Sequence, residues 1–113
     1  MIPYLPNNCE FFQMTTDKFS SNFLPSIKFN AAFIDADHSS ISGFKDFENL
    51  YKFLQPGGYI FLHDTYPCVD YLLSPTFCND CYKTPIKIKK TYSDIEILTF
   101  PFNPGLTIVR KLF

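Results

Sequence analysis

Apolar residues gather in short runs along the chain, and two of these runs end abruptly in polar clusters. Residues 27–34 become apolar on both faces toward their end and stop at Asp35, and residues 59–62 are apolar throughout and stop at His63. A strand that is apolar on both faces is typical of a parallel sheet covered by helices. The pattern therefore predicts two buried strands, each followed directly by acidic and imidazole side chains.

A helical period lies between these two strands. The spacing predicts a helix from about Ser42, as its N-cap, to Leu54, and the Pro-Gly-Gly of residues 56–58 supplies a stop signal. A strand, a crossover helix and a second strand in one sheet are parallel, so both polar ends are expected at the same edge. The apolar face of the helix consists of residues three and four positions apart, namely Phe44, Phe47, Leu50, Tyr51 and Leu54.

Further elements are predicted on both sides of this unit. They are a strand at Glu10–Met14, a brief helix capped by Thr15 or Thr16 and ended by Pro25, a short helix at Val69–Leu73, and strands at Ile86–Lys90, Ile95–Phe100 and Leu106–Val109, the last two joined by a turn at 103–105. The predicted fold class is α/β, in a single domain over residues 1–113. It combines parallel strands and a crossover helix with a C-terminal antiparallel hairpin.

Composition changes the picture mainly by exclusion. Of 113 residues, 46% are hydrophobic, and 10 basic residues against 11 acidic ones give a net charge of −1 with the histidines neutral. This charge leaves no field to draw the chain onto nucleic acid or an anionic membrane. The longest apolar runs fall far short of the ~20 residues that cross a bilayer, and Met1–Pro6 lacks the regions of a signal peptide. We therefore expect a soluble, cytoplasmic protein whose partner is a small-molecule substrate.

The four cysteines are expected to be reduced, because no signal peptide accompanies them. Cys78 and Cys81 have the spacing with which two thiolates share a zinc ion, and Cys68 could add a third ligand. The sequence holds no second pair of this kind. Ordinary loop cysteines are the favoured interpretation, and a zinc or redox site stays open.

The candidate chemistry lies at the polar ends of the two strands. Asp35, Asp37 and His38 follow the first strand, and His63 and Asp64 end the second. In open α/β sheets, ligands bind beyond the carboxyl ends of the strands. Carboxylate oxygens suit a divalent cation such as Mg²⁺ or Mn²⁺, and a neutral imidazole can accept a proton near pH 7. The sequence therefore predicts either a cation site or a general base at this edge.

Three motifs occur in order at these positions: FIDADHS at residues 33–39, LQPGGYI at 54–60 and HDT at 63–65. Together they resemble the carboxyl half of class I S-adenosylmethionine-dependent methyltransferases. The resemblance is strongest to the small-molecule O-methyltransferase-like group, whose last strand is similar to residues 104–110. It extends over about Glu10 to Lys111, and it implies a partial Rossmann-like methyltransferase sheet.

The resemblance also implies roles for individual residues. In metal-dependent members, acids at these two strand ends bind a divalent cation that orients two substrate oxygens. Carried over, this makes Asp35 and Asp64 metal ligands and His63 a possible third. His38 becomes the catalytic base that removes the proton of the acceptor hydroxyl. Asp35 and Asp37 are the expected contacts to the cofactor, S-adenosylmethionine.

The resemblance makes the few glycines informative. Members of the family bind S-adenosylmethionine chiefly through a glycine-rich turn after their first strand. The glycines here stand at positions 43, 57, 58 and 105, and they form no Gly-x-Gly. The sequence therefore predicts a truncated or degenerate O-methyltransferase that corresponds to the C-terminal half of the fold. An exposed edge of its parallel sheet is expected to need cover from a partner or from a second copy in a homo-oligomer.

Two other functions stay open. The spacing Asp35-x-Asp37-x-Ser39 after a strand also resembles the aspartate motif of haloacid dehalogenase-like phosphatases. There the first acid is the nucleophile and the second is the acid/base, so the chain would be a metal-dependent hydrolase. The remaining alternative is a non-enzymatic interaction module.

Overall fold

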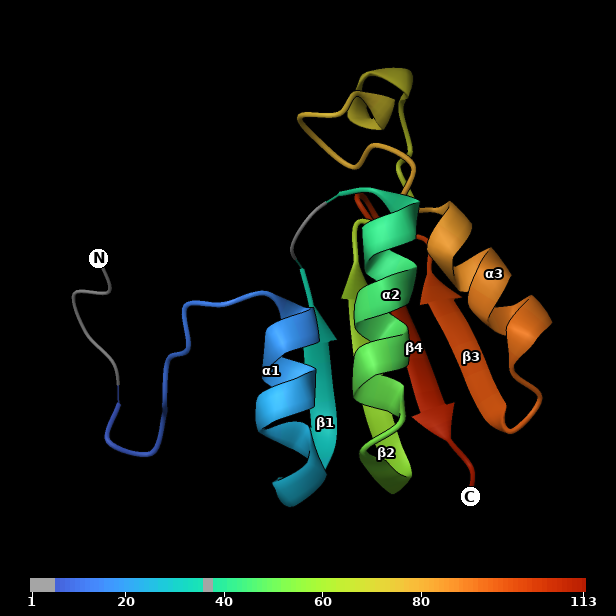
Figure 1. Cartoon of the computed structure of the whole chain (residues 1–113). Helices are drawn as coiled ribbons and strands as arrows, with labels where there is room; N and C mark the ends of the chain where they lie inside the picture. Colours follow the sequence, from blue (N-terminus) through green and yellow to red (C-terminus); the bar gives the residue numbers. More distant parts are fainter. Residues whose placement is uncertain (1–5, 36–37) are drawn as a thin grey trace.

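A four-stranded sheet forms the centre of the protein in the computed structural model, which describes residues 6–35 and 38–113 (Figure 1). The first two strands along the sheet are parallel, and the other two neighbouring pairs are antiparallel. This arrangement confirms the predicted α/β class with a C-terminal hairpin. In spatial order the strands are β1 (Phe29–Ile34), β2 (Leu54–His63), β4 (Leu106–Lys111) and β3 (Ile95–Phe100).

Three helices lie on one face of this sheet: α1 (Thr16–Asn22), α2 (Ser40–Tyr51) and α3 (Lys83–Thr91) (Figure 1). Two 3₁₀ turns, η1 (Leu24–Ser26) and η2 (Asp70–Leu73), complete the described elements. None of the helices in 6–35 and 38–113 has both the length and the apolar character needed to cross a membrane.

The opposite face of the sheet has no helical layer within the described residues. Side chains alternate between the two faces of a strand, and those that point away from α2 and α3 include Phe33, Tyr59 and Leu98, all of them exposed. Phe33 of β1 is 59% exposed, next to its strand partner Phe61. The prediction of strands buried on both faces is therefore wrong for the described residues, in which helices cover one face and the apolar side chains of the other are exposed.

The core lies between the sheet and the pair α2 and α3. Phe47, Ile60, Ile88 and Val109 come from four different elements, and each is 0% exposed. Burying apolar side chains on this scale supplies the main stabilisation of a small α/β unit. The apolar period of α2 thus meets the alternating inner faces of β2 and β4.

The ends of α2 differ from those predicted. The helix begins at Ser40, because the side chain of Ser39 accepts the Ser42 N–H at 3.2 Å and is the N-cap. Placing the N-cap at Ser42 was wrong. At the other end, Lys111 Nζ donates to the carbonyls of Tyr51 and Leu54 at 3.0 and 3.1 Å. A lysine from β4 therefore supplies hydrogen bonds to carbonyls near the C-terminal end of α2. From the sequence, Pro-Gly-Gly was predicted to end this helix.

Pro-Gly-Gly instead lies inside β2, which begins at Leu54 rather than at Tyr59. The pairing with β1 is irregular there, since the register shifts between Phe29 and Ala31. Gly57 takes a φ of +81°, a left-handed conformation that suits glycine. The extra residues bulge out of the ladder, and regular pairing resumes at Tyr59.

Two predicted strands were wrong. Residues 10–14 form no strand, and Phe12 packs its ring against Phe19 and Phe23 instead. Residues 86–90 belong to α3, because the Ile and Lys alternation also fits a helix whose buried side includes Thr84 and Ile88, four residues apart. The brief helix capped by Thr15 and the final hairpin are confirmed, and the short helix predicted at Val69–Leu73 is the 3₁₀ turn η2 at Asp70–Leu73.

The buried position of Phe47 predicts a large loss of stability on truncation. Phe47→Ala should lower the free energy of unfolding by about 3–5 kcal/mol, since it removes a fully buried ring and leaves a cavity. Chemical denaturation of the chain measures this. Ile41→Ala, on the same helix but at a side chain that is 80% exposed, is the control and should change stability little. Equal losses in the two variants would contradict the packing described.

Candidate functional site

The polar ends of β1 and β2 meet at one edge of the sheet, as the parallel topology requires. Ile34 pairs with Leu62, so the next residues, Asp35 and His63, emerge side by side. Asp64 follows β2 directly, and His38 precedes the N-cap of α2. Four polar residues from two strand ends are therefore brought together.

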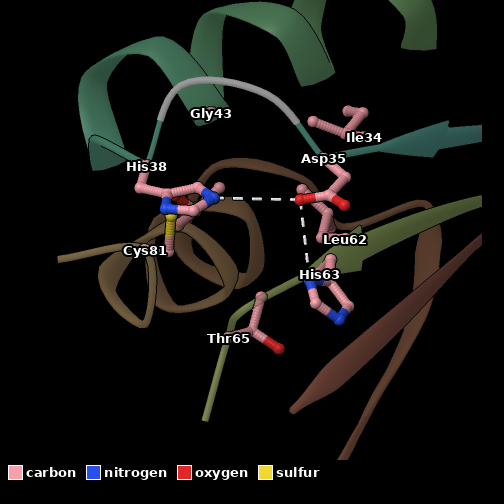
Figure 2. Close-up of a pocket in the computed structure, with 9 residues that line it drawn as sticks. Ile34, Asp35, His38, Gly43, Leu62, His63, Thr65 and Cys81 are labelled. Atoms are coloured by element: carbon pink, nitrogen blue, oxygen red, sulfur yellow. Dashed lines mark ion pairs between the residues drawn. The ribbon is translucent and has the colours of Figure 1, made fainter. Parts of the chain in front are cut away.

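The carboxylate of Asp64 lies between two imidazoles. Its Oδ2 is 3.0 Å from His38 Nε2 and 3.1 Å from His63 Nδ1. Asp35 Oδ1 is 3.8 and 3.5 Å from the same two nitrogens, and Figure 2 shows Asp35 between the rings. Each imidazole can thus share a proton or a cation with two carboxylates.

The two acids differ in their environment. The Asp64 side chain is only 10% exposed, whereas the Asp35 side chain keeps 45% of its surface open to solvent. Both imidazoles are about one-third exposed. A buried carboxylate needs partners for its charge, so Asp64 is the fixed centre of the site and Asp35 forms its open side.

The backbone at Asp64 is held by the turn between β3 and β4. Asp64 has a φ of +61°, and its N–H donates to the Gly105 carbonyl at 3.1 Å. The N–H of Tyr66 donates to the Pro104 carbonyl at 2.8 Å. A side chain at position 105 would run into the backbone of Tyr66, so glycine allows this close approach.

A cysteine that sequence analysis left as an ordinary loop residue also contacts the site. Cys78 Sγ donates to Asp64 Oδ1 at 3.5 Å, and Cys78 is 2% exposed. Burial, together with the nearby Asp64, raises the pKa of the Cys78 thiol to about 11. The thiol therefore keeps its proton at neutral pH, and no sequence motif marked it as a neighbour of Asp64.

Asp80 joins the same loop to the start of α2. Its carboxylate accepts the Ser40 N–H at 2.7 Å and the Ser40 hydroxyl at 2.9 Å. The backbone hydrogen bond from Ser40 is the main reason that the pKa of Asp80 lies below its ordinary value. An anion at a helix N-terminus is also favoured by the helix dipole. Asp80 thus fixes the loop beside the segment that carries His38.

Two cavities adjoin this edge. The smaller has a volume of about 20 Å³, room for one water-sized particle, and Asp35, His38, His63 and Thr65 are among its lining residues (Figure 2). The larger has about 540 Å³, within the range of small-molecule sites. Thr65 lines both of them. Tyr66, Leu73, Tyr82 and Ile86 are among the residues that give the larger cavity its apolar and aromatic wall.

The donor set fits a single cation. Asp35, His63 and Asp64 can each offer one ligand atom, and these atoms lie within 4.8 Å of one another. Among the described residues, His63 Nδ1 is buried without a hydrogen bond, although two carboxylate oxygens stand within 3.5 Å of it. A buried polar atom without a partner is unfavourable, and a cation or a proton between these groups would remove the penalty.

The structure thus brings together four of the five residues singled out in the sequence, namely Asp35, His38, His63 and Asp64. Asp37 lies outside the described residues. The four cysteines form no disulfide with one another, and the close donor group found among the described residues includes none of them. Sequence analysis did not connect Cys78 or Gly105 with this site, because the residues that they contact there are distant in the chain.

The comparisons with known proteins agree on one class. Residues 2–65 match the family described as "Methyltransferase domain". This segment contains both site strands and the helix between them, and it covers more than half of the chain. The chain therefore belongs to the methyltransferase-domain family. No curated protein matches the sequence.

Solved structures show the fold. A protein from Corynebacterium glutamicum matches with a TM-score of 0.69 and 16% identity over 97% of this chain and 50% of its own. The SAH-bound methyltransferase PaMTH1 from Podospora anserina matches with a TM-score of 0.63 and 16% identity over 88% of this chain and 47% of its own. The chain spans about half the length of these structures. The predicted partial methyltransferase sheet is confirmed, and the phosphatase-like alternative is not favoured.

The contact between Asp80 and Ser40 predicts a pH-dependent contribution to stability. Asp80→Asn should lower the free energy of unfolding by about 1 kcal/mol at neutral pH, because it weakens a helix cap. Since folding lowers the pKa of Asp80 below 3.8, the charged group stabilises the fold above that pH, and its contribution is lost as the pH falls further.

Denaturation of wild type and Asp80→Asn from pH 7 down to pH 2 tests this sign. The difference between the two should shrink below about pH 4. Glu10→Gln, at an exposed side chain, is the control and should show no such difference. A gap that widens on acidification would contradict the assignment.

Proposed function

We propose that the chain acts in S-adenosylmethionine-dependent methylation of a small-molecule hydroxyl, with a divalent cation at the edge formed by β1 and β2. The observation that carries the proposal is the close group of Asp35, His63 and Asp64 at two strand ends of a methyltransferase-family domain. His38 stands beside them as the candidate base.

The cation would be held by Asp35, His63 and Asp64. Carboxylate oxygens favour Mg²⁺ and Mn²⁺, and the imidazole tips the preference toward Mn²⁺. The buried Nδ1 of His63 supports this set, because it makes no hydrogen bond among the described residues although two carboxylate oxygens lie within 3.5 Å, and a cation between them would bind all three atoms. A bound cation would supply positive charge at the place where the acceptor hydroxyl loses its proton.

S-adenosylmethionine would supply the methyl group from its sulfonium. The family and the SAH-bound structural neighbour support this cofactor. Asp35 and Asp37 are the residues proposed to contact it. Asp35 Oδ1 also lies 3.5 Å from His63 Nδ1, so the Asp35 carboxylate would lie between the cofactor and the cation and contact both.

His38 is placed to hold the proton that leaves the acceptor. Its Nε2 lies 3.0 Å from Asp64 Oδ2 and 3.8 Å from Asp35 Oδ1. Because Nε2 faces these carboxylates and would carry the proton shared with them, the proton from the acceptor would go to Nδ1 of the ring. The two carboxylates would stabilise the imidazolium that forms. Asp64 would also limit how the ring turns, which keeps Nε2 at the strand ends.

The larger cavity supports a small acceptor with an apolar or aromatic body. Its volume of about 540 Å³ fits such a molecule, and Tyr66, Tyr82 and Ile86 form part of an apolar wall. Thr65 lines both this cavity and the smaller one beside the acids. The net charge of −1 agrees with a small molecule rather than a nucleic acid as substrate.

Binding of Mn²⁺ tests the cation. Isothermal titration of the chain with Mn²⁺ should show one saturable site, and Asp64→Asn should weaken it at least about tenfold by removing a buried ligand. Asp70→Asn, at an exposed acid that begins η2, is the control and should bind as wild type does. Absence of binding to the wild-type chain, or equal binding by Asp64→Asn, would overturn the proposed cation site.

The methyltransferase and phosphatase alternatives make opposite predictions. We expect binding of S-adenosylhomocysteine, measured by titration in the presence of Mn²⁺, to be detectable but weaker than in a chain that carries the glycine-rich turn. We expect no hydrolysis of p-nitrophenyl phosphate with Mg²⁺. The Asp35→Asn variant should weaken the first measurement. Hydrolysis that disappears in Asp35→Asn, without binding of S-adenosylhomocysteine, would instead establish the phosphatase-like reaction.

A further inference from the structure

The thiol of Cys78 donates a hydrogen bond to one oxygen of the Asp64 carboxylate. Cys78 Sγ donates to Asp64 Oδ1 at 3.5 Å, while Asp64 Oδ2 faces His38 and His63. The thiol is thus on one side of the carboxylate group and the two imidazoles are on the other. This division determines which way the carboxylate plane is turned.

The loop that carries Cys78 is itself fixed. The Cys78 N–H donates to the Leu72 carbonyl at 2.8 Å, and its own carbonyl accepts the Cys81 N–H at 3.1 Å. Two residues further along, Asp80 caps α2 through Ser40. The thiol therefore approaches Asp64 from a segment tied both to η2 and to the helix that follows His38.

We propose that Cys78 is a positioning residue, whose thiol holds the Asp64 carboxylate so that Oδ2 points to the imidazoles and to the cation site. This inference rests on the proposed function for its role in metal binding. Its structural part, the orientation of Asp64 toward His38 and His63, stands on the contacts alone.

The hydrogen bond between Cys78 and Asp64 matters because both residues are buried. Cys78 is 2% exposed and Asp64 is 7% exposed, so water has little access to replace the thiol as donor. Removing a donor from a buried carboxylate oxygen leaves that oxygen unsatisfied. The carboxylate would then turn to regain a partner, and Oδ2 would leave its place between the rings. Groups that orient metal ligands typically change metal affinity by about 10–100-fold.

Three substitutions separate the hydrogen bond from packing. Cys78→Ser keeps a donor, Cys78→Val fills the space without one, and Cys78→Ala removes both. We expect Mn²⁺ affinity, measured by titration, to fall about 10–100-fold in the Val and Ala variants and to stay near wild type in the Ser variant. Cys68→Ala, at an exposed thiol, is the control and should bind as wild type does.

A second measurement needs no metal. Nitrogen-15 NMR of the metal-free chain gives the chemical shifts of the ring nitrogens of His38 and His63. We expect these chemical shifts to change in Cys78→Val and to equal the wild-type values in Cys78→Ser. A purely structural role for Cys78 would not be rescued by a hydroxyl in this way.

The outcomes distinguish this inference from the proposed function. If wild type binds Mn²⁺ and Cys78→Val binds equally well, the role of Cys78 is overturned and the cation site stands. If wild type binds no Mn²⁺, the cation site fails, and the ring nitrogens alone decide whether Cys78 orients Asp64. Should the Val and Ala variants fail to fold, Cys78→Ser decides: a loss of Mn²⁺ affinity there overturns the inference, and retained affinity with unchanged ring signals supports it.

Discussion

The parallel pairing of β1 with β2 is the constraint on which the site depends. The register that sets Ile34 opposite Leu62 places Asp35 beside His63, and the crossover through α2 returns the chain so that both strands end at the same edge. A slip by one residue would turn the apolar side chains of a strand to the other face. The same apolar alternation that builds the core therefore also aligns the polar ends.

Three separate parts of the chain position Asp64. Strand β2 delivers the residue, the Gly105 carbonyl accepts its backbone N–H, and Cys78 donates to its side chain. Burying a carboxylate is unfavourable unless such partners are present. The turn of the β3–β4 hairpin and the loop that carries Cys78 thus make a buried acid possible at the end of β2.

Local patterns predicted the elements well where one period dominated. Residues 95–100 alternate with no competing helical pattern, and they form β3 as expected. Residues 86–90 carry two periods at once, and packing of Ile88 against the core decided for a helix. Residues 10–14 are apolar enough for a strand, but a strand also needs a neighbouring strand to pair with. Phe12 instead packs against the rings of Phe19 and Phe23.

The sequence alone determined which polar residues could meet, because strand direction follows from a strand, helix and strand order, and each polar run follows its strand directly. It also carried the motifs that place the chain among methyltransferase domains. Only the tertiary structure decided how these side chains are turned: that Asp64 is buried, that its oxygens divide between Cys78 and the imidazoles, and that Gly105 supports its backbone. Those partners lie in loops without a period, and their contacts depend on how the whole chain closes.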